Sequence, residues 1–120
     1  MYKCVKFENL IGEVFEKVTS DDYTIKFYKK SGDNQPAFSV YHDQECSEHV
    51  YIESIVGDLF DLEGNPILMS ESSSNEGESN DSHATWTFIK FATIKGYVDI
   101  RFLGTSNGYY SESADLYMLI

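Results

Sequence analysis

The strongest constraint on the fold is a two-residue alternation of apolar and polar side chains near the C-terminal end. In residues 97–103, Val98, Ile100 and Phe102 share one side of an extended chain, and polar residues alternate with them. This period is that of a β-strand with one buried face. The dipeptide Lys95-Gly96 just before it predicts a tight turn from a preceding strand. The chain is therefore expected to consist mainly of antiparallel strands.

The same reasoning extends to most of the sequence. Strands are predicted over residues 14–18, 23–28, 37–42, 67–69, 85–94 and 109–120, joined by turns of Gly, Ser, Asn and Asp. A short helical turn is predicted from Phe7 to Gly12, because glycine is common just past a helix end. Residues 71–83 are rich in Ser, Asn, Gly and acid, which predicts a mobile acidic loop.

One segment departs from the two-residue period. Between Glu48 and Leu62 the apolar residues recur at helical spacing: Ile52, Ile55, Val56, Leu59 and Phe60. Acidic residues fill the other face, so an amphipathic helix over about 48–62 is predicted. The expected fold is α+β and mainly β, with six to seven strands in an antiparallel sheet covered by that helix, or in a small sandwich.

Composition limits the domain organisation and the location. A chain of 120 residues, with 42% hydrophobic and 15% aromatic residues, is expected to form a single domain over residues 1–120 with one core. No stretch has the length of a signal peptide or a membrane helix, so a cytoplasmic protein is expected. Cys4 and Cys46 are not in a CxxC pair and are interpreted as free thiols.

The charge is distributed very unevenly. Between Ser31 and Ile89 there are twelve Asp and Glu and no Lys or Arg, and the whole net charge of −11 is accounted for by this region. A field of one sign over half a domain repels nucleic acid and anionic membranes and attracts cationic partners. The alternative is that the acidity only aids solubility.

Several blocks of the sequence resemble an uncharacterised family of small bacteriophage and prophage proteins. The blocks are YHDQEC (41–46), VYIE (50–53), GDL (57–59), TWTF (85–88), ATIKG (92–96) and SNGYYSES (106–113). The resemblance covers roughly residues 8 to 116 and implies a viral accessory protein in the host cytosol, with no established activity. The chain departs from the family pattern at His49, where a small residue is more usual.

A compact group of possible metal ligands occurs in the middle of the chain: His42, Asp43, Cys46 and His49. Zinc takes these donors, but a structural site normally gathers two ligand pairs that lie far apart in sequence. The alternative is a strand-to-helix junction, and neither a metal nor a cofactor is expected. Catalytic signatures such as G-x-S-x-G, the phosphate loop and H-E-x-x-H are missing, so no enzymatic activity is expected.

Two sets of residues are candidates for binding. The first would contact a basic protein and consists of carboxylates with a tyrosine-rich loop: Glu45, Glu48, Asp58, Asp61, Glu63, Asn107, Tyr109, Tyr110 and Glu112. Tyrosine offers a large contact area at low entropic cost. The second would form an aromatic pocket for a nucleotide, with an arginine for its phosphate: Trp86, Tyr97, Arg101 and Tyr109.

Three functions therefore compete. The first is a binding protein that inhibits a basic host protein, such as a nucleic-acid-binding component of antiviral defence, in the manner of an anti-CRISPR protein. The second is a sponge that sequesters a nucleotide signal in the aromatic pocket. The third is a structural or accessory phage protein. Exposed tyrosines and an acidic helix are also compatible with a homodimer.

Overall fold

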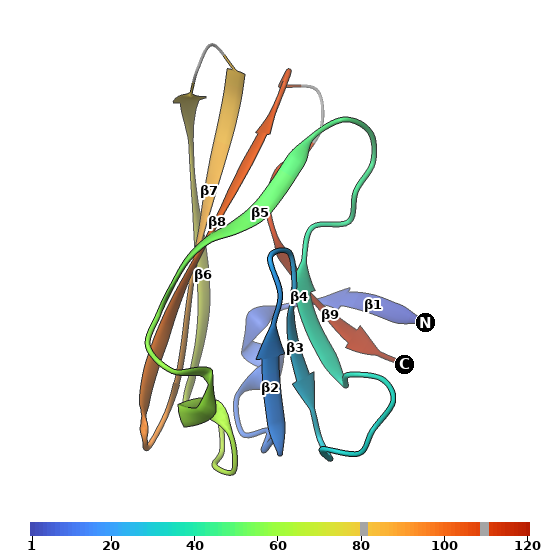
Figure 1. The fold of residues 1–120 in the computed structure, drawn as a ribbon, viewed down its shortest axis with the longest axis vertical. Helices are drawn as coiled ribbons and strands as arrows, with labels where there is room; N and C mark the ends of the chain where they lie inside the picture. The colour runs from blue at the N-terminus through green and yellow to red at the C-terminus, as the bar shows by residue number, and fades with distance from the viewer. Residues whose placement is uncertain (80–81, 109–110) are drawn as a thin grey trace.

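The computed structural model describes residues 1–79, 82–108 and 111–120, which form two antiparallel sheets packed face to face (Figure 1). The five-stranded sheet has the order β1 (Tyr2–Val5), β9 (Asp115–Leu119), β4 (Phe38–Tyr41), β3 (Ile25–Tyr28) and β2 (Lys17–Ser20). The four-stranded sheet has the order β5 (His49–Val56), β8 (Gly96–Ser106), β7 (Ser82–Thr93) and β6 (Met69–Ser79). The predicted antiparallel β architecture is confirmed, with nine strands in these residues rather than six to seven.

The alternation that predicted the C-terminal strands determines which face of the four-stranded sheet is buried. Val98, Ile100 and Phe102 of β8 point into the core, and the neighbouring strand β7 is in continuous register with β8 from His83↔Ser106 to Thr93↔Gly96. Across the core, the ring of Phe91 on β7 meets that of Phe27 on β3, with 5.3 Å between centroids. Burying each such side chain stabilises the fold by about 1.5–3 kcal/mol, so these contacts hold the two sheets together.

The amphipathic helix predicted over 48–62 is wrong. The segment forms strand β5 and then a single 3-10 turn, η2 (Leu59–Leu62). The register of β5 against β8 shifts between Ile52 and Ser54, so Glu53 is an extra residue of a β-bulge. The bulge puts Ile52 and Ile55 on the same face although they are three apart, and a 3-10 helix also repeats every three residues. The bulge and the 3-10 turn together give the apolar residues the spacing that is typical of an amphipathic helix.

Gly57 separates these two elements. Its φ is +108°, which favours glycine, and a side chain at this position would lie 2.7 Å from the carbonyl oxygen of Tyr97. The chain can therefore leave β5 close to the backbone of β8 and turn into η2. At the other end of the chain, the helical turn predicted from Phe7 to Gly12 is a 3-10 helix, η1 (Phe7–Leu10).

The acidic loop predicted over 71–83 is also corrected. Residues up to Ser79 belong to β6, which pairs with β7 residue by residue from Met69↔Ala92 to Ser79↔Ser82, and residues 80–81 lie outside the described residues. The strand lies at an edge of its sheet and contributes little to the core, since Ser70 is the only residue of β6 with described burial that is buried. Its inward-facing Ser70 donates a hydrogen bond to the carbonyl of Phe7 at 2.6 Å, and its backbone bonds to β7 replace the missing apolar contacts.

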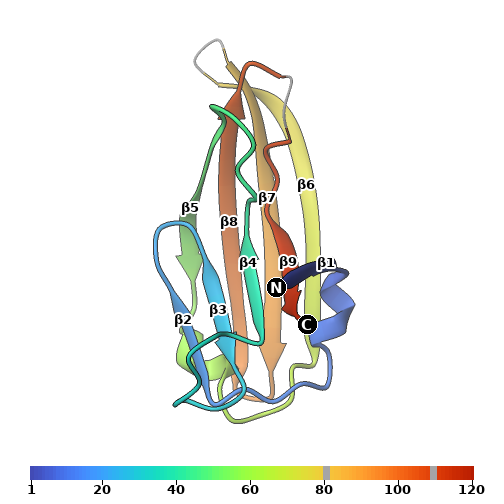
Figure 2. The same cartoon turned by 90° about the vertical axis from the view of Figure 1, so that its right-hand side faces the viewer.

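Strands β6, β7 and β8 are much longer than those of the five-stranded sheet, so one end of the four-stranded sheet extends past its partner (Figures 1 and 2). The β4–β5 connection and the segment that leads into β9 cover this overhang. Among the described residues there is no helix long and apolar enough to cross a membrane.

Candidate functional site

The overhanging end of the sandwich is strongly acidic. We call it the acidic end and define it as residues 42–52, 74–79, 82–87, 102–108 and 111–114. These residues include no Lys or Arg and contain all three histidines of the protein. Four of their carboxylates are exposed and form no ion pair with any described residue: Asp43, Glu45, Glu76 and Glu78. Two others, Glu48 and Glu112, are buried.

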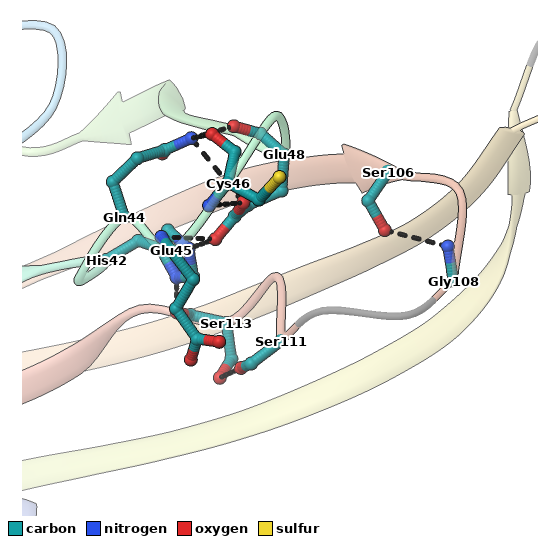
Figure 3. Close-up of polar contacts among 9 residues, drawn as sticks. All are labelled: His42, Gln44, Glu45, Cys46, Glu48, Ser106, Gly108, Ser111 and Ser113. Carbon is teal, nitrogen blue, oxygen red and sulfur yellow. Dashed lines mark hydrogen bonds and ion pairs between the residues drawn. The ribbon is translucent and has the colours of Figure 1, made fainter.

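Glu48 organises the β4–β5 loop from inside (Figure 3). Its carboxylate accepts hydrogen bonds from the backbone N–H groups of Glu45 at 2.9 Å and Cys46 at 2.8 Å, and from His42 Nε2 at 2.8 Å. The bond from His42 is the main reason that the pKa of Glu48 falls to about 2; burial opposes the shift, and the two backbone groups reinforce it. Glu48 is therefore a charged structural residue of this loop.

His42 connects that loop to the segment before β9. Its Nδ1 donates a hydrogen bond to the carbonyl oxygen of Ser113 at 2.9 Å, while Nε2 faces the Glu48 carboxylate (Figure 3). The two contacts of the His42 ring thus fix the position of Ser113, and of its neighbour Glu112, relative to the Glu48 carboxylate.

Glu112 is the second buried carboxylate. Oε1 accepts hydrogen bonds from His83 Nδ1 at 2.5 Å and from the Thr85 hydroxyl at 2.9 Å. Burial raises the pKa of Glu112, but the hydroxyl of Ser106 and the bonds from His83 and Thr85 outweigh burial, so the pKa lies below its ordinary value. Oε2 is buried and forms no hydrogen bond with any described residue. A charged group with an unsatisfied buried oxygen is unusual in a folded protein.

The backbone of Glu112 passes very close to β8. A Cβ atom on Gly104 would lie 2.2 Å from the carbonyl oxygen of Glu112, so only glycine permits this approach. On β7, the Thr87 hydroxyl accepts a hydrogen bond from the N–H of Ala114 at 3.3 Å. Two neighbouring strands therefore hold residues 111–114 against the inner face of the overhang.

A polar cavity of about 240 Å³ lies beside Glu112. We call it the Glu112 pocket; its lining residues are Ser74, Glu76, His83, Thr85, Gly108, Ser111, Glu112 and Ser113. Its walls offer two carboxylates, one imidazole and several hydroxyls, and no Lys or Arg. This set of groups can accept hydrogen bonds from a cation.

The structure divides the predicted partner-binding residues between two ends of the molecule. Glu45, Glu48, Asn107 and Glu112 are at the acidic end, where Glu45 and Asn107 are exposed. Tyr109 and Tyr110 lie outside the described residues. The remaining three lie around η2, at the opposite end of β5: Asp58, Asp61 and Glu63.

Two of the carboxylates around η2 have structural partners there. Asp58 caps η2 by accepting a hydrogen bond from Phe60 N at 2.9 Å, and Glu63 accepts one from Val18 N at 2.8 Å. Because β5 separates these residues from the acidic end, the predicted carboxylates do not form one continuous surface.

Trp86, Tyr97 and Arg101 share the outer face of the four-stranded sheet, but they do not enclose a pocket together. A shallow groove of about 570 Å³ on this face is lined by Arg101 and Phe88 and not by Trp86 or Tyr97. Arg101 is already engaged by Glu53, with Nε and Oε2 at 2.6 Å. Tyr109 lies outside the described residues.

The four possible metal ligands are not gathered around a common point. His42 is bound to Glu48, whereas Cys46 and His49 are exposed, and the ring of His49 stacks on that of Tyr51 at 5.0 Å. In the described part of the chain, no group of three or more His, Cys, Asp or Glu side chains is arranged to hold a metal ion. Cys4 and Cys46 are both free.

Sequence reasoning did not identify His83, Thr85 and Glu76 as part of a site. One signal was present: the inward positions of β7 are apolar at Ile89 and Phe91 but become hydroxylated at Thr85 and Thr87. Inward hydroxyls indicate that a polar group is buried against this part of the strand. The identity of that group, Glu112, depends on the tertiary structure.

The comparisons with known proteins give a family and no function. The family described as a domain of unknown function (DUF7448) matches residues 8–116, almost the whole chain. No curated protein and no solved structure matches the chain.

Proposed function

Because the chain belongs to the DUF7448 family, whose function is unknown, we propose a function from its geometry: a non-enzymatic binding protein whose acidic end contacts a basic protein. The observation that carries this proposal is the exposure of Asp43, Glu45, Glu76 and Glu78 on an end without Lys or Arg. A surface region that carries several carboxylates and no cation has a potential of one sign, which attracts a cationic surface.

The contacts that hold the loops of this end in place support the same interpretation. Glu48 and His42 hold the β4–β5 loop, and Gly104 and Thr87 hold residues 111–114 against the sheet. Loops that are held by such contacts lose less conformational entropy on binding than unrestrained loops, which leaves more of the interaction energy for affinity. Long-range attraction between opposite charges also accelerates association.

The phage setting comes from the sequence resemblance alone. In that setting the partner would be a basic host protein, such as a nucleic-acid-binding component of antiviral defence, and the acidic end would compete with phosphate for its cationic groove. The nucleotide sponge has less support, because the guanidinium of Arg101 is occupied by Glu53 and the groove beside it does not include Trp86 or Tyr97.

The test compares two variants with the same change in charge. The acidic-end variant neutralises four exposed carboxylates: Asp43→Asn, Glu45→Gln, Glu76→Gln and Glu78→Gln. The control variant neutralises four exposed carboxylates elsewhere that have no ion-pair partner among the described residues: Glu8→Gln, Glu16→Gln, Asp22→Asn and Glu71→Gln. Tagged versions of both and of the wild type are used to capture proteins from bacterial cells, and each captured protein is then purified and titrated.

We expect a basic protein that binds the wild type and the control variant, with at least tenfold weaker binding to the acidic-end variant. Its association rate should fall as salt screens the field, over a Debye length of about 8 Å at physiological ionic strength. Equal loss of binding in both variants, or retention of binding by the acidic-end variant, would refute a role for this end.

A further inference from the structure

We propose that the Glu112 pocket binds a primary alkylammonium group, and that this group is the head of a lysine side chain of the basic partner. The proposal rests on the proposed function and assigns one specific contact within it. The observations that carry it are the unsatisfied buried oxygen of Glu112, the charge of the pocket and the arrangement of its acceptors.

The first observation is the state of the Glu112 carboxylate. Its side chain is 1% exposed, yet Oε2 forms no hydrogen bond with any described residue. Leaving a buried charged acceptor unsatisfied costs more than leaving a neutral one, and a carboxylate can accept several hydrogen bonds at its two oxygens. The Ser106 hydroxyl lies near enough to lower the pKa of this carboxyl, but it makes no hydrogen bond to Oε2. The fold therefore keeps a strong acceptor beside a cavity with one oxygen that no described residue bonds.

The second observation is the sign of the charge. Glu76 lines the same cavity as Glu112 and is exposed to solvent, and no Lys or Arg lies at the acidic end. His83 already donates its Nδ1 hydrogen to Oε1. An anionic ligand would meet two carboxylates here, whereas a cation would be attracted by both.

The third observation is the geometry of the acceptors, which selects among cations. A guanidinium group prefers a bidentate contact with both oxygens of a carboxylate, but Oε1 already accepts hydrogen bonds from His83 and Thr85. A primary ammonium has three donors on one compact atom. In the proposed complex one donor bonds Oε2 and the others bond hydroxyls of the lining, such as those of Ser111 and Ser113, which lie 3.3 Å apart and hydrogen-bond to each other without a ligand.

The size of the cavity agrees with this ligand. At about 240 Å³ it is far larger than the space of one water molecule, roughly 30 Å³, and it can admit the end of a lysine side chain. A metal ion would need more ligands, and the described residues offer no group of three His, Cys, Asp or Glu for one. The pocket also lies on the acidic end that we propose as the partner-binding surface.

The test uses n-butylammonium as the probe, with n-butanol as the uncharged analogue of the same length. Chemical shifts of the Thr85, Ser111 and Ser113 amides are followed by NMR in the wild type, in Glu112→Gln and in Glu45→Gln. The Gln at position 112 keeps an oxygen acceptor for His83 and Thr85 and can place an NH₂ group where Oε2 was. The Glu45 variant removes one charge from the same end without altering the pocket lining.

We expect saturable shifts with butylammonium in the wild type and in Glu45→Gln, and at least tenfold weaker binding in Glu112→Gln. Saturation by butanol at the same concentration, or undiminished binding in Glu112→Gln, would overturn the proposal. If Glu112→Gln fails to fold, Glu76→Gln at the exposed side of the pocket replaces it. We expect this variant to bind butylammonium at least threefold more weakly, and an unchanged affinity would also overturn the proposal.

Two further titrations distinguish the source of the ammonium group. Nα-acetyl-lysine N-methylamide represents a lysine side chain, and 1,4-diaminobutane represents a free polyamine. Saturable binding of the lysine derivative supports a lysine head, whereas exclusive binding of the diamine overturns the assignment to a protein partner. A partner that binds Glu112→Gln as tightly as the wild type refutes this contact but leaves the proposed function intact, because the latter is tested by the exposed carboxylates.

Discussion

Replacing Gly104 by alanine tests whether residues 111–114 are pressed against β8. The new Cβ would lie 2.2 Å from the carbonyl oxygen of Glu112, 2.7 Å from its Cβ and 3.0 Å from its carbonyl carbon. Non-bonded atoms are most stable at about 3.5–4.0 Å, so the backbone at Glu112 must move by roughly 1 Å. Overpacking of this kind costs typically about 1–3 kcal/mol, and the movement also weakens the bonds from His83 and Thr85 to Glu112.

We therefore expect Gly104→Ala to lower the free energy of unfolding by about 3 kcal/mol, which corresponds to a melting midpoint lower by about 12 °C for a domain of this size. The matched control is Gly32→Ala, because no heavy atom lies within 4 Å of a Cβ at that position and the backbone is not left-handed; its effect should stay within about 1 kcal/mol. Thermal and urea denaturation followed by circular dichroism measure both. A midpoint for Gly104→Ala within about 2 °C of the control would refute the close contact.

Three further predictions concern stability. The pKa of Glu48 is lowered from 4.5 to about 2, so the contribution of Glu48 to stability is fully present above pH 4.5 and is lost as the pH falls toward 2. Glu48→Gln should therefore remove this part of the pH dependence of the urea midpoint. Phe91→Ala should cost about 3–5 kcal/mol in urea denaturation, since Phe91 is fully buried against Phe27; a loss below about 1 kcal/mol would contradict its central place in the core. Arg101→Gln should change stability by at most about 1 kcal/mol in the same assay, because its ion pair with Glu53 is partly exposed to solvent. A larger loss would show that this pair supports the β5 bulge.

Short-range pattern was sufficient to predict the strands that are buried on one face only. The alternation of Val98, Ile100 and Phe102 predicted β8, and the Lys95-Gly96 pair predicted the turn from β7. These features are local, because the direction of a side chain in a strand depends only on its position in the sequence. The lack of Lys and Arg between Ser31 and Ile89 likewise indicates an acidic region from residue types alone.

The short-range pattern gave wrong predictions where the secondary structure of a segment, or the direction of its side chains, depends on pairing with a neighbouring strand. Ile52 and Ile55 share a face because β5 carries a bulge opposite β8, and nothing in their spacing distinguishes that bulge from a helical turn. The serine-rich strand β6 has no apolar period of its own and exists because its backbone pairs with β7. In both segments, pairing with another strand determines the secondary structure more strongly than the intrinsic preferences of the local residues do.

The sequence by itself determined the β-rich class, the single-signed charge of the middle of the chain and the residue types of the proposed binding surface. Only the tertiary structure decided which of its carboxylates are exposed. It buries Glu48 and Glu112, leaves Glu45 exposed beside them and moves Asp58 to the opposite end of β5. The physical reason is that burial and charge pairing depend on contacts between residues far apart in the chain, such as His42 with Ser113 and His83 with Glu112. Such contacts produce no periodic pattern in the sequence from which they could be predicted.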